Sequence, residues 1–113
     1  MKSARLVVYP VKDLDAAKAF YTQTLGAEPY VDSPYYVGFK VGDDEVGLDP
    51  NGHAGGFTGP VAYWQVDDLD AAVATFTGAG AEVVQAAQQV GPGMRRASVR
   101  DTDGNITGMV EQK

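Results

Sequence analysis

The chain has 113 residues, a length that suits one domain and leaves little room for two. Hydrophobic residues make up 44% and charged residues 21%, which indicates a globular protein rather than a disordered one. The net charge of −6 argues against a nucleic-acid partner and against binding to an anionic membrane surface. The absence of cysteine excludes disulfides and thiolate metal sites, and a single histidine excludes multi-histidine metal sites within one chain.

The apolar residues are distributed as in a protein that does not enter a membrane. No apolar run approaches about 18 residues, and the N-terminus does not resemble a signal peptide. We therefore expect no membrane partner and a cytoplasmic location.

The first half of the chain predicts a strand, a helix and three further strands. Residues 5–11 form an apolar, β-branched run that is typical of a buried strand. Asp13 offers an N-cap oxygen for a helix over 14–24, along which apolar residues recur at helical spacing. Gly26 is placed to end this helix. The strands that follow are predicted at about 27–32, 35–41 and 45–49.

The second half predicts the same order of elements. A strand at 61–66 is followed by an N-cap at Asp68 and a helix over 69–78. The Asp-Gly-Asn sequence at 103–105 predicts a hairpin turn between the last two strands. These three later strands are predicted at about 81–87, 94–100 and 105–111.

Two glycine-rich segments are predicted as loops. Residues 50–60 contain four glycines and two prolines, which indicates a mobile connection between the halves, and residues 88–93 form a second loop. Each loop either borders a ligand site or is a plain connection.

An internal repeat underlies this two-part order. Residues 11–22, VKDLDAAKAFYT, match residues 66–77, VDDLDAAVATFT, at eight of twelve positions. A repeat at about half the chain length indicates two similar modules that bury their apolar faces together. We therefore expect a single domain, 1–113, made of a first module at 1–52, a linker at 53–59 and a second module at 60–113.

The order βαβββ, used twice, resembles the vicinal oxygen chelate superfamily, which includes glyoxalase I, extradiol dioxygenases, and fosfomycin and bleomycin resistance proteins. The resemblance depends on the helix-opening residues Val11–Tyr21 and Val66–Leu69, and on the later sequence RDTDGN at 100–105. The last of these is similar to a family pattern, Asp-Pro-Asp-Gly-Asn, with Thr102 in place of proline.

This resemblance implies an α+β fold in which tandem modules form a curled, eight-stranded mixed sheet around a cleft, with two helices outside. It also implies four metal-ligand positions, and in this chain they are occupied by Leu6, Gly47, Val61 and Gly108. None of these residues carries an oxygen or nitrogen donor in its side chain, so we expect no metal and no cofactor. The chain is thus most similar to the metal-free bleomycin-resistance branch.

Strand alternation predicts which side chains would line the implied cleft. It places Tyr63 in the cleft and Trp64 in the core. Asp49 is either a general base or a solvated carboxylate at a strand end, and Arg96 either binds an anion or balances the acidic surface. The candidate ligand-binding residues are Tyr36, Asp49, Tyr63, Gln65, Met94, Arg96 and Ser98.

These features favour a metal-free protein that binds a small, planar or aromatic molecule and so sequesters an antibiotic or metabolite. The alternative is a lyase-, isomerase- or dioxygenase-like enzyme with an atypical metal site, or metal-free acid–base chemistry at Asp49 or Tyr63. A third hypothesis is a regulatory or partner-binding domain. The resemblance also implies a homodimer.

Overall fold

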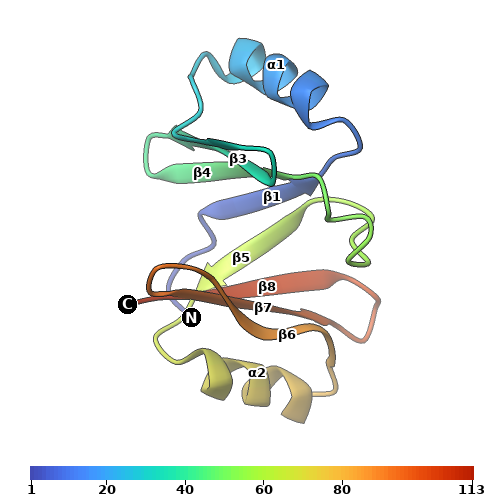
Figure 1. The fold of residues 1–113 in the computed structure, drawn as a ribbon. Coiled ribbons are helices and arrows are strands. Elements are labelled where there is room, and N and C mark those ends of the chain that lie inside the picture. The colour runs from blue at the N-terminus through green and yellow to red at the C-terminus, as the bar shows by residue number, and fades with distance from the viewer. The chain divides into compact units, whose positions relative to one another are not determined.

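The computed structural model describes all 113 residues, and the chain forms two compact units (Figure 1). The first, here called the first module, comprises Arg5–Val61. The second module comprises Ala62–Lys113 together with the N-terminal residues Met1–Ala4. Neither helix of the chain is long and apolar enough to cross a membrane.

The first module contains one helix and a four-stranded mixed sheet. In the sheet the strands follow the order β2-β3-β4-β1, with β1 and β4 parallel and the other neighbours antiparallel. The elements are β1 (Leu6–Pro10), α1 (Leu14–Leu25), β2 (Val31–Ser33), β3 (Tyr36–Val41) and β4 (Asp44–Asp49).

The second module repeats this topology. Its strands follow the order β5-β8-β7-β6, and β5 and β8 form the parallel pair. Eight strands and two helices thus form the mixed α+β architecture that the sequence predicts. The elements are β5 (Val61–Gln65), α2 (Leu69–Gly78), β6 (Glu82–Gly91), β7 (Met94–Arg100) and β8 (Ile106–Gln112).

Both helices begin as the repeated Asp-Leu-Asp sequence predicts. The Asp13 side chain accepts a hydrogen bond from the Ala16 N–H at 3.0 Å, and Asp68 accepts one from the Ala71 N–H at 3.1 Å. Each cap satisfies a helix-terminal donor that has no partner inside the helix. Gly26 ends α1 with φ of 65°, a conformation that glycine adopts without steric cost.

A buried carboxylate also joins α2 to its sheet. Glu111 on β8 is 5% exposed, and its Oε1 accepts a hydrogen bond from the Leu69 N–H at 2.9 Å. Its other oxygen lies 3.6 Å from the Arg95 guanidinium. A carboxylate at a helix N-terminus is favoured by the positive end of the helix dipole, so this contact fixes where α2 starts on the sheet.

Each module has its own apolar cluster between helix and sheet. In the first module, Val37, Phe39 and Leu48 are fully buried and pack against the apolar side of α1. The second cluster lies between α2 and its sheet, and its buried members are Val66, Leu69, Ala97, Val99 and Met109. Val41 has the same alternation along β3 as Val37 and Phe39, but it lies at the end of the strand and is 41% exposed.

Two predicted stretches of the chain have different boundaries in the structure. Strand β2 is only three residues long, and most of the strand predicted at 27–32 lies outside it. Strand β6 continues through Gly91, so the loop predicted at 88–93 is a two-residue hairpin turn at Pro92 and Gly93. Gly93 has φ of 68°, and pairing with β7 extends the strand to this turn.

The segment predicted as a mobile connection at 50–60 contains hydrogen-bonded turns. The Phe57 N–H donates to the Gly52 carbonyl at 3.0 Å, and the Gly55 N–H donates to the Asn51 carbonyl at 3.0 Å. Phe57 is 2% exposed and anchors the segment by its buried ring. The glycines of this segment predict mobility, but the buried ring of Phe57 holds it in place.

Strand alternation predicts Trp64 to be a core residue, and this prediction is wrong. Trp64 pairs in register with Met109, so it lies on the helix side of its sheet, but it is 37% exposed. The contacts of α2 fall on β6, β7 and β8, so this helix does not extend far enough to cover β5.

The partial exposure of Trp64 gives a stability prediction. Trp64→Ala should lower the free energy of unfolding by only about 1–2 kcal/mol, because it opens a surface recess that water refills rather than a closed cavity. Phe39→Ala, at a fully buried position, should cost about 3–5 kcal/mol. Urea unfolding of both variants measures the difference, and equal costs would contradict the assignment.

Candidate functional site

The residues of interest lie on the side of each sheet that is turned away from its helix, here called the helix-free face. Side chains alternate along a strand, so the neighbours of buried Phe39 and Leu48 point away from α1. By the same rule, Tyr63 and Gly108 lie opposite the side on which Met109 packs against α2.

In the first module, two glycines lie side by side at the centre of this face. Gly47 pairs with Gly38 on one neighbouring strand and with Val8 on the other. The space above Gly47 is occupied by the Tyr36 side chain: a Cβ atom at Gly47 would overlap the Tyr36 hydroxyl and lie 2.6 Å from Cζ. Real Cβ contacts are not this short, so no side chain fits at Gly47 while Tyr36 keeps its position.

A second tyrosine covers the other glycine. A Cβ atom at Gly38 would lie 3.1 Å from Cε1 of Tyr30. The Tyr30 hydroxyl donates a hydrogen bond to Glu45 at 2.5 Å, and the Lys40 ammonium lies 4.7 Å from the ring centroid. Partial burial of the ring, and then the bond to Glu45, raise the pKa of Tyr30, so its phenol remains a protonated donor well above neutral pH. Tyr30 is not among the predicted site residues, because it precedes β2 and strand alternation does not apply to it.

In the second module a tyrosine again lies over a glycine. Gly108 on β8 is in register with Tyr63 on β5 and with Ser98 on β7. A Cβ atom at Gly108 would overlap Cδ1 of the Tyr63 ring and lie 2.7 Å from Cγ. Tyr63 is 1% exposed, so its ring is buried on this glycine rather than open to solvent.

Arg96 and Ser98 lie next to this tyrosine. The central carbon of the Arg96 guanidinium lies 5.5 Å from the centroid of the Tyr63 ring, a cation–π arrangement. Ser98 is fully buried, and its Oγ has no hydrogen-bond partner. A buried hydroxyl without a partner costs free energy. Ser98 is therefore the residue on this face that most clearly indicates a missing hydrogen-bond partner.

The two faces have the same strand order and a corresponding register, but they carry different side chains. In the register of the strands, Gly47 corresponds to Gly108 as the central residue of each module. The covering tyrosine comes from β3 in the first module and from β5 in the second. The position on β7 that corresponds to Tyr36 on β3 holds Arg96, two residues before Ser98.

The other predicted site residues are less closely grouped. Gln65 shares a register with Val110 and Arg96, but its side chain is exposed. Met94 pairs with Gln112 at the start of β7. Asp49 ends β4, and its Oδ1 accepts a hydrogen bond from the Asn51 N–H at 2.8 Å, which helps to form the turn that follows.

The residues at the implied metal-ligand positions do not fit a metal ion. Leu6 is half-buried and Val61 is 1% exposed, and neither has a donor atom. Gly47 and Gly108 are covered by tyrosine side chains. No group of three or more His, Cys, Asp or Glu side chains is placed to hold a metal ion, and the single His53 is exposed in the turn segment after β4.

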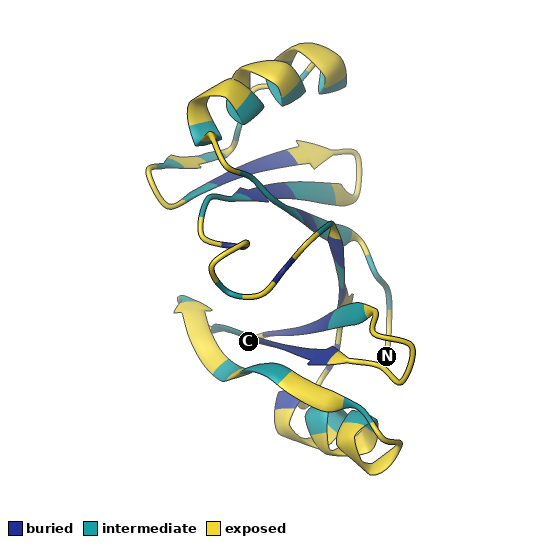
Figure 2. Cartoon of the chain, turned by 90° about the vertical axis from the view of Figure 1, so that its right-hand side faces the viewer, coloured by how far each residue is buried: buried dark blue, intermediate teal, exposed yellow.

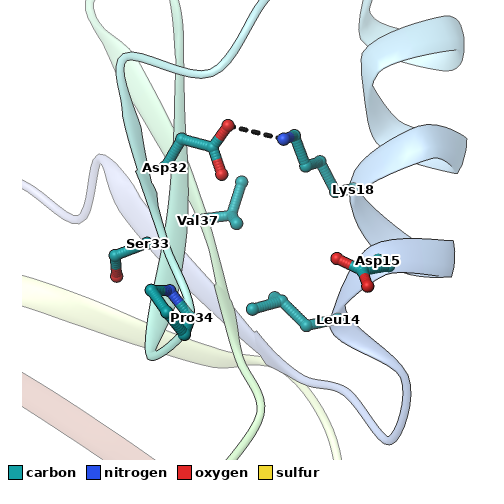
Figure 3. Close-up of a pocket in the computed structure, with 7 residues that line it drawn as sticks. All are labelled: Leu14, Asp15, Lys18, Asp32, Ser33, Pro34 and Val37. Carbon is teal, nitrogen blue, oxygen red and sulfur yellow. Dashed lines mark hydrogen bonds and ion pairs between the residues drawn. The ribbon is translucent and has the colours of Figure 1, made fainter.

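Two surface hollows lie elsewhere, on the helix sides of the modules. The hollow shown in Figure 3, of about 360 Å³, lies between α1 and the β2–β3 hairpin, where Lys18 and Asp32 form an ion pair at 2.5 Å. The other, of about 290 Å³, adjoins Asp68 and the N-terminal residues. Neither contains a predicted site residue or an unpartnered buried polar atom. We therefore locate the candidate site on the helix-free faces.

A sequence profile of the Glyoxalase/Bleomycin resistance protein/Dioxygenase superfamily matches residues 4–107, and the chain belongs to this superfamily. No curated protein sequence matches it. The prediction of the superfamily from the repeated motifs is therefore confirmed, whereas nothing in the match singles out the bleomycin-resistance branch.

Solved structures show the same fold at low sequence identity. Streptomyces coelicolor methylmalonyl-CoA epimerase, in complex with 2-nitronate-propionyl-CoA, is similar with a TM-score of 0.77, 18% identity and coverage of 99% of this chain and 98% of that chain. A superfamily member from Vibrio splendidus 12B01 is similar with a TM-score of 0.73 and 16% identity, over 96% of this chain and 97% of that chain. A Legionella pneumophila protein described as an NAD-dependent benzaldehyde dehydrogenase is similar with a TM-score of 0.76 and 19% identity, over 96% of this chain and 98% of that chain.

The tyrosine–glycine contacts predict unequal costs for two alanine substitutions. Gly108→Ala should destabilise the protein by about 1–3 kcal/mol, because the new methyl group meets the rigid root of the Tyr63 ring. Gly47→Ala should cost less, because it meets mainly the hydroxyl end of Tyr36, which can move.

Thermal and urea unfolding measure both costs. Combining Gly108→Ala with Tyr63→Ala should cost less than the sum of the two single changes, since the clash is then removed. Strict additivity would show that Tyr63 does not occupy the space above Gly108.

Proposed function

We propose that this protein binds a small, planar or aromatic organic molecule without a metal ion, as a cytoplasmic binding protein of the glyoxalase/bleomycin-resistance type. The observation that carries the proposal is the pair of tyrosine–glycine contacts. Where the family resemblance places metal-ligating side chains, this chain has glycines whose space is filled by Tyr36 and Tyr63. Aromatic side chains and a few polar groups are the usual composition of a small-molecule site.

The second module supplies the polar groups that would orient such a ligand. Ser98 presents a buried hydroxyl without a hydrogen-bond partner, next to the Tyr63 ring and two residues from Arg96. A ligand that brings a hydrogen-bonding group to Ser98 would satisfy this hydroxyl and recover the free energy that it loses on burial. The Tyr63 ring, which fills the space over Gly108, would have to move to admit such a ligand. Sequestration of an antibiotic or metabolite requires no further chemistry.

The second candidate is an enzyme that acts by metal-free acid–base chemistry. It is supported by the similarity in fold to methylmalonyl-CoA epimerase, together with the carboxylate of Asp49 in the first module. Incubation of the protein with methylmalonyl-CoA in deuterated water tests it, because an epimerase exchanges the proton next to the acyl carbonyl. No exchange above the buffer rate favours the binding protein.

Metal analysis gives the first test of the proposal. The purified protein, dialysed without chelator and then incubated with Zn²⁺, Mn²⁺, Fe²⁺ or Ni²⁺, should retain much less than one equivalent of each ion. Mass spectrometry of the metal content after gel filtration measures this. Retention of one equivalent, lost in a Tyr36→Ala or Tyr63→Ala variant, would contradict the proposal.

Ser98→Ala gives the second test, because it separates stability from binding. It should leave the free energy of unfolding unchanged or raise it by up to about 1 kcal/mol, since the lost hydroxyl has no partner. Binding of the best probe from a thermal-shift screen that includes bleomycin and acyl-CoA esters should weaken by about 5–10-fold, equivalent to about 1–1.4 kcal/mol.

The matched control is Thr75→Ala, which removes a hydroxyl that bonds to the Ala71 carbonyl on exposed α2. This variant should bind the probe as the parent protein does. Equal affinities for the parent and the Ser98→Ala variant, measured by calorimetry, would remove Ser98 from the site.

A further inference from the structure

Two tyrosine rings meet over Gly38 on the helix-free face of the first module. A Cβ atom at Gly38 would lie 3.1 Å from Cε1 of Tyr30 and 3.3 Å from Cε2 of Tyr36, so an edge of each ring reaches the space above this glycine. The Tyr30 N–H donates a hydrogen bond to the Gly38 carbonyl at 2.9 Å, which fixes Tyr30 beside β3. The two rings therefore form one aromatic surface at a fixed place on the sheet.

A carboxylate adjoins this surface. Oε2 of Glu45 accepts the hydrogen bond from the Tyr30 hydroxyl. Glu45 lies two residues before Gly47 on β4, so strand alternation places it on the same helix-free face. The face of an aromatic ring attracts a cation through its quadrupole, and a carboxylate beside the ring adds Coulombic attraction. The arrangement is thus suited to a positively charged group.

A cation of the chain itself already occupies this place. Lys40 is directly opposite Glu45 in the register of β3 and β4, yet it forms no ion pair, and its ammonium lies 4.7 Å from the centroid of the Tyr30 ring. Strand β3 is buried along its middle and exposed at its end, where Lys40 lies (Figure 2). A flexible, exposed lysine can leave the ring without disturbing the core.

The second module differs at the corresponding place. Arg96 holds the position on β7 that corresponds to Tyr36, and its guanidinium lies over the Tyr63 ring at 5.5 Å from the centroid. Arg96 is less exposed than Lys40. An added cation would meet a fixed positive charge there, whereas in the first module it would meet only an exposed lysine side chain.

We propose that Tyr30, Tyr36 and Glu45 form a binding site for a small molecule with a quaternary ammonium group, which displaces the Lys40 side chain. A metal ion needs several oxygen or nitrogen ligands, whereas a quaternary ammonium group needs only aromatic faces and a counter-charge. The net charge of −6 favours the approach of a cation. The inference adds a site to the proposed function without resting on it, because Tyr63 and Ser98 take no part.

The test is an NMR titration of the full chain with choline chloride, at an ionic strength kept constant with sodium chloride and followed on the ring signals of Tyr30. Choline should shift these signals with a dissociation constant on the order of 10 mM, as suits partly exposed cation–π contacts. Its neutral carbon isostere, in which a tert-butyl group replaces the trimethylammonium group, should bind at least about threefold more weakly.

Variants separate the proposed contacts from general electrostatics. Lys40→Ala should tighten choline binding about threefold to fivefold, because the competing ammonium is removed. Lys12→Ala removes the same charge from an exposed lysine elsewhere and should leave the affinity unchanged. Glu45→Gln keeps an acceptor for Tyr30 but removes the negative charge, and it should weaken binding about threefold.

The outcomes are distinct from those of the Ser98 test. Ser98→Ala should bind choline as the parent protein does, because Ser98 lies in the second module. Equal affinities for choline and its carbon isostere, the same tightening in Lys12→Ala as in Lys40→Ala, or Tyr30 signals that do not move would each overturn the proposal.

Discussion

The close approach of a tyrosine side chain to a glycine backbone is the constraint on which both helix-free faces depend. At Gly47 and Gly108 a single added carbon would meet a tyrosine atom far inside van der Waals distance. Each glycine and its tyrosine are therefore one steric unit, and neither can change size alone without cost. This unit determines which chemical groups fit at the centre of each face. It fills the centre of each face with an aromatic side chain, and it leaves no space for the donor side chains that a metal needs.

The helix starts could be predicted because the interactions that define them are local. Each capping aspartate accepts a hydrogen bond from the N–H three residues later. The repeated sequence therefore contains both the donor and the acceptor of each cap. Strand boundaries depend on pairing with distant residues, which explains why β2 is shorter and β6 longer than predicted. The alternation rule assigned Tyr63 and Trp64 to the correct sides of β5, but it could not give their burial. The exposure of Trp64 depends on how far α2 extends across the sheet.

The candidate site was predictable only in part, for the same reason. Strand register brings Ser98 beside Gly108 and Tyr63, and alternation already placed Ser98 and Tyr63 on one side of their strands. The role of the glycines was not predictable. From the sequence they indicate only missing donors, whereas the structure shows them as the space that a tyrosine fills. Tyr30 could not be found, because it acts from a loop through a hydrogen bond to Glu45, fifteen residues away.

The two modules are similar in the residues that begin their helices and different in the residues on their helix-free faces. The helix-opening residues are nearly identical in the two copies, yet the residues facing away from the helices have diverged, with Tyr36 in one copy where the other has Arg96. Divergence after duplication has therefore spared what starts a helix and altered what a ligand would contact. Because the two faces carry different side chains, one face cannot replace the other after a damaging substitution. Relatives with similar helix-free faces are recognised by comparing the residues around Gly47 and Gly108, because the repeated motif reflects only how each helix begins.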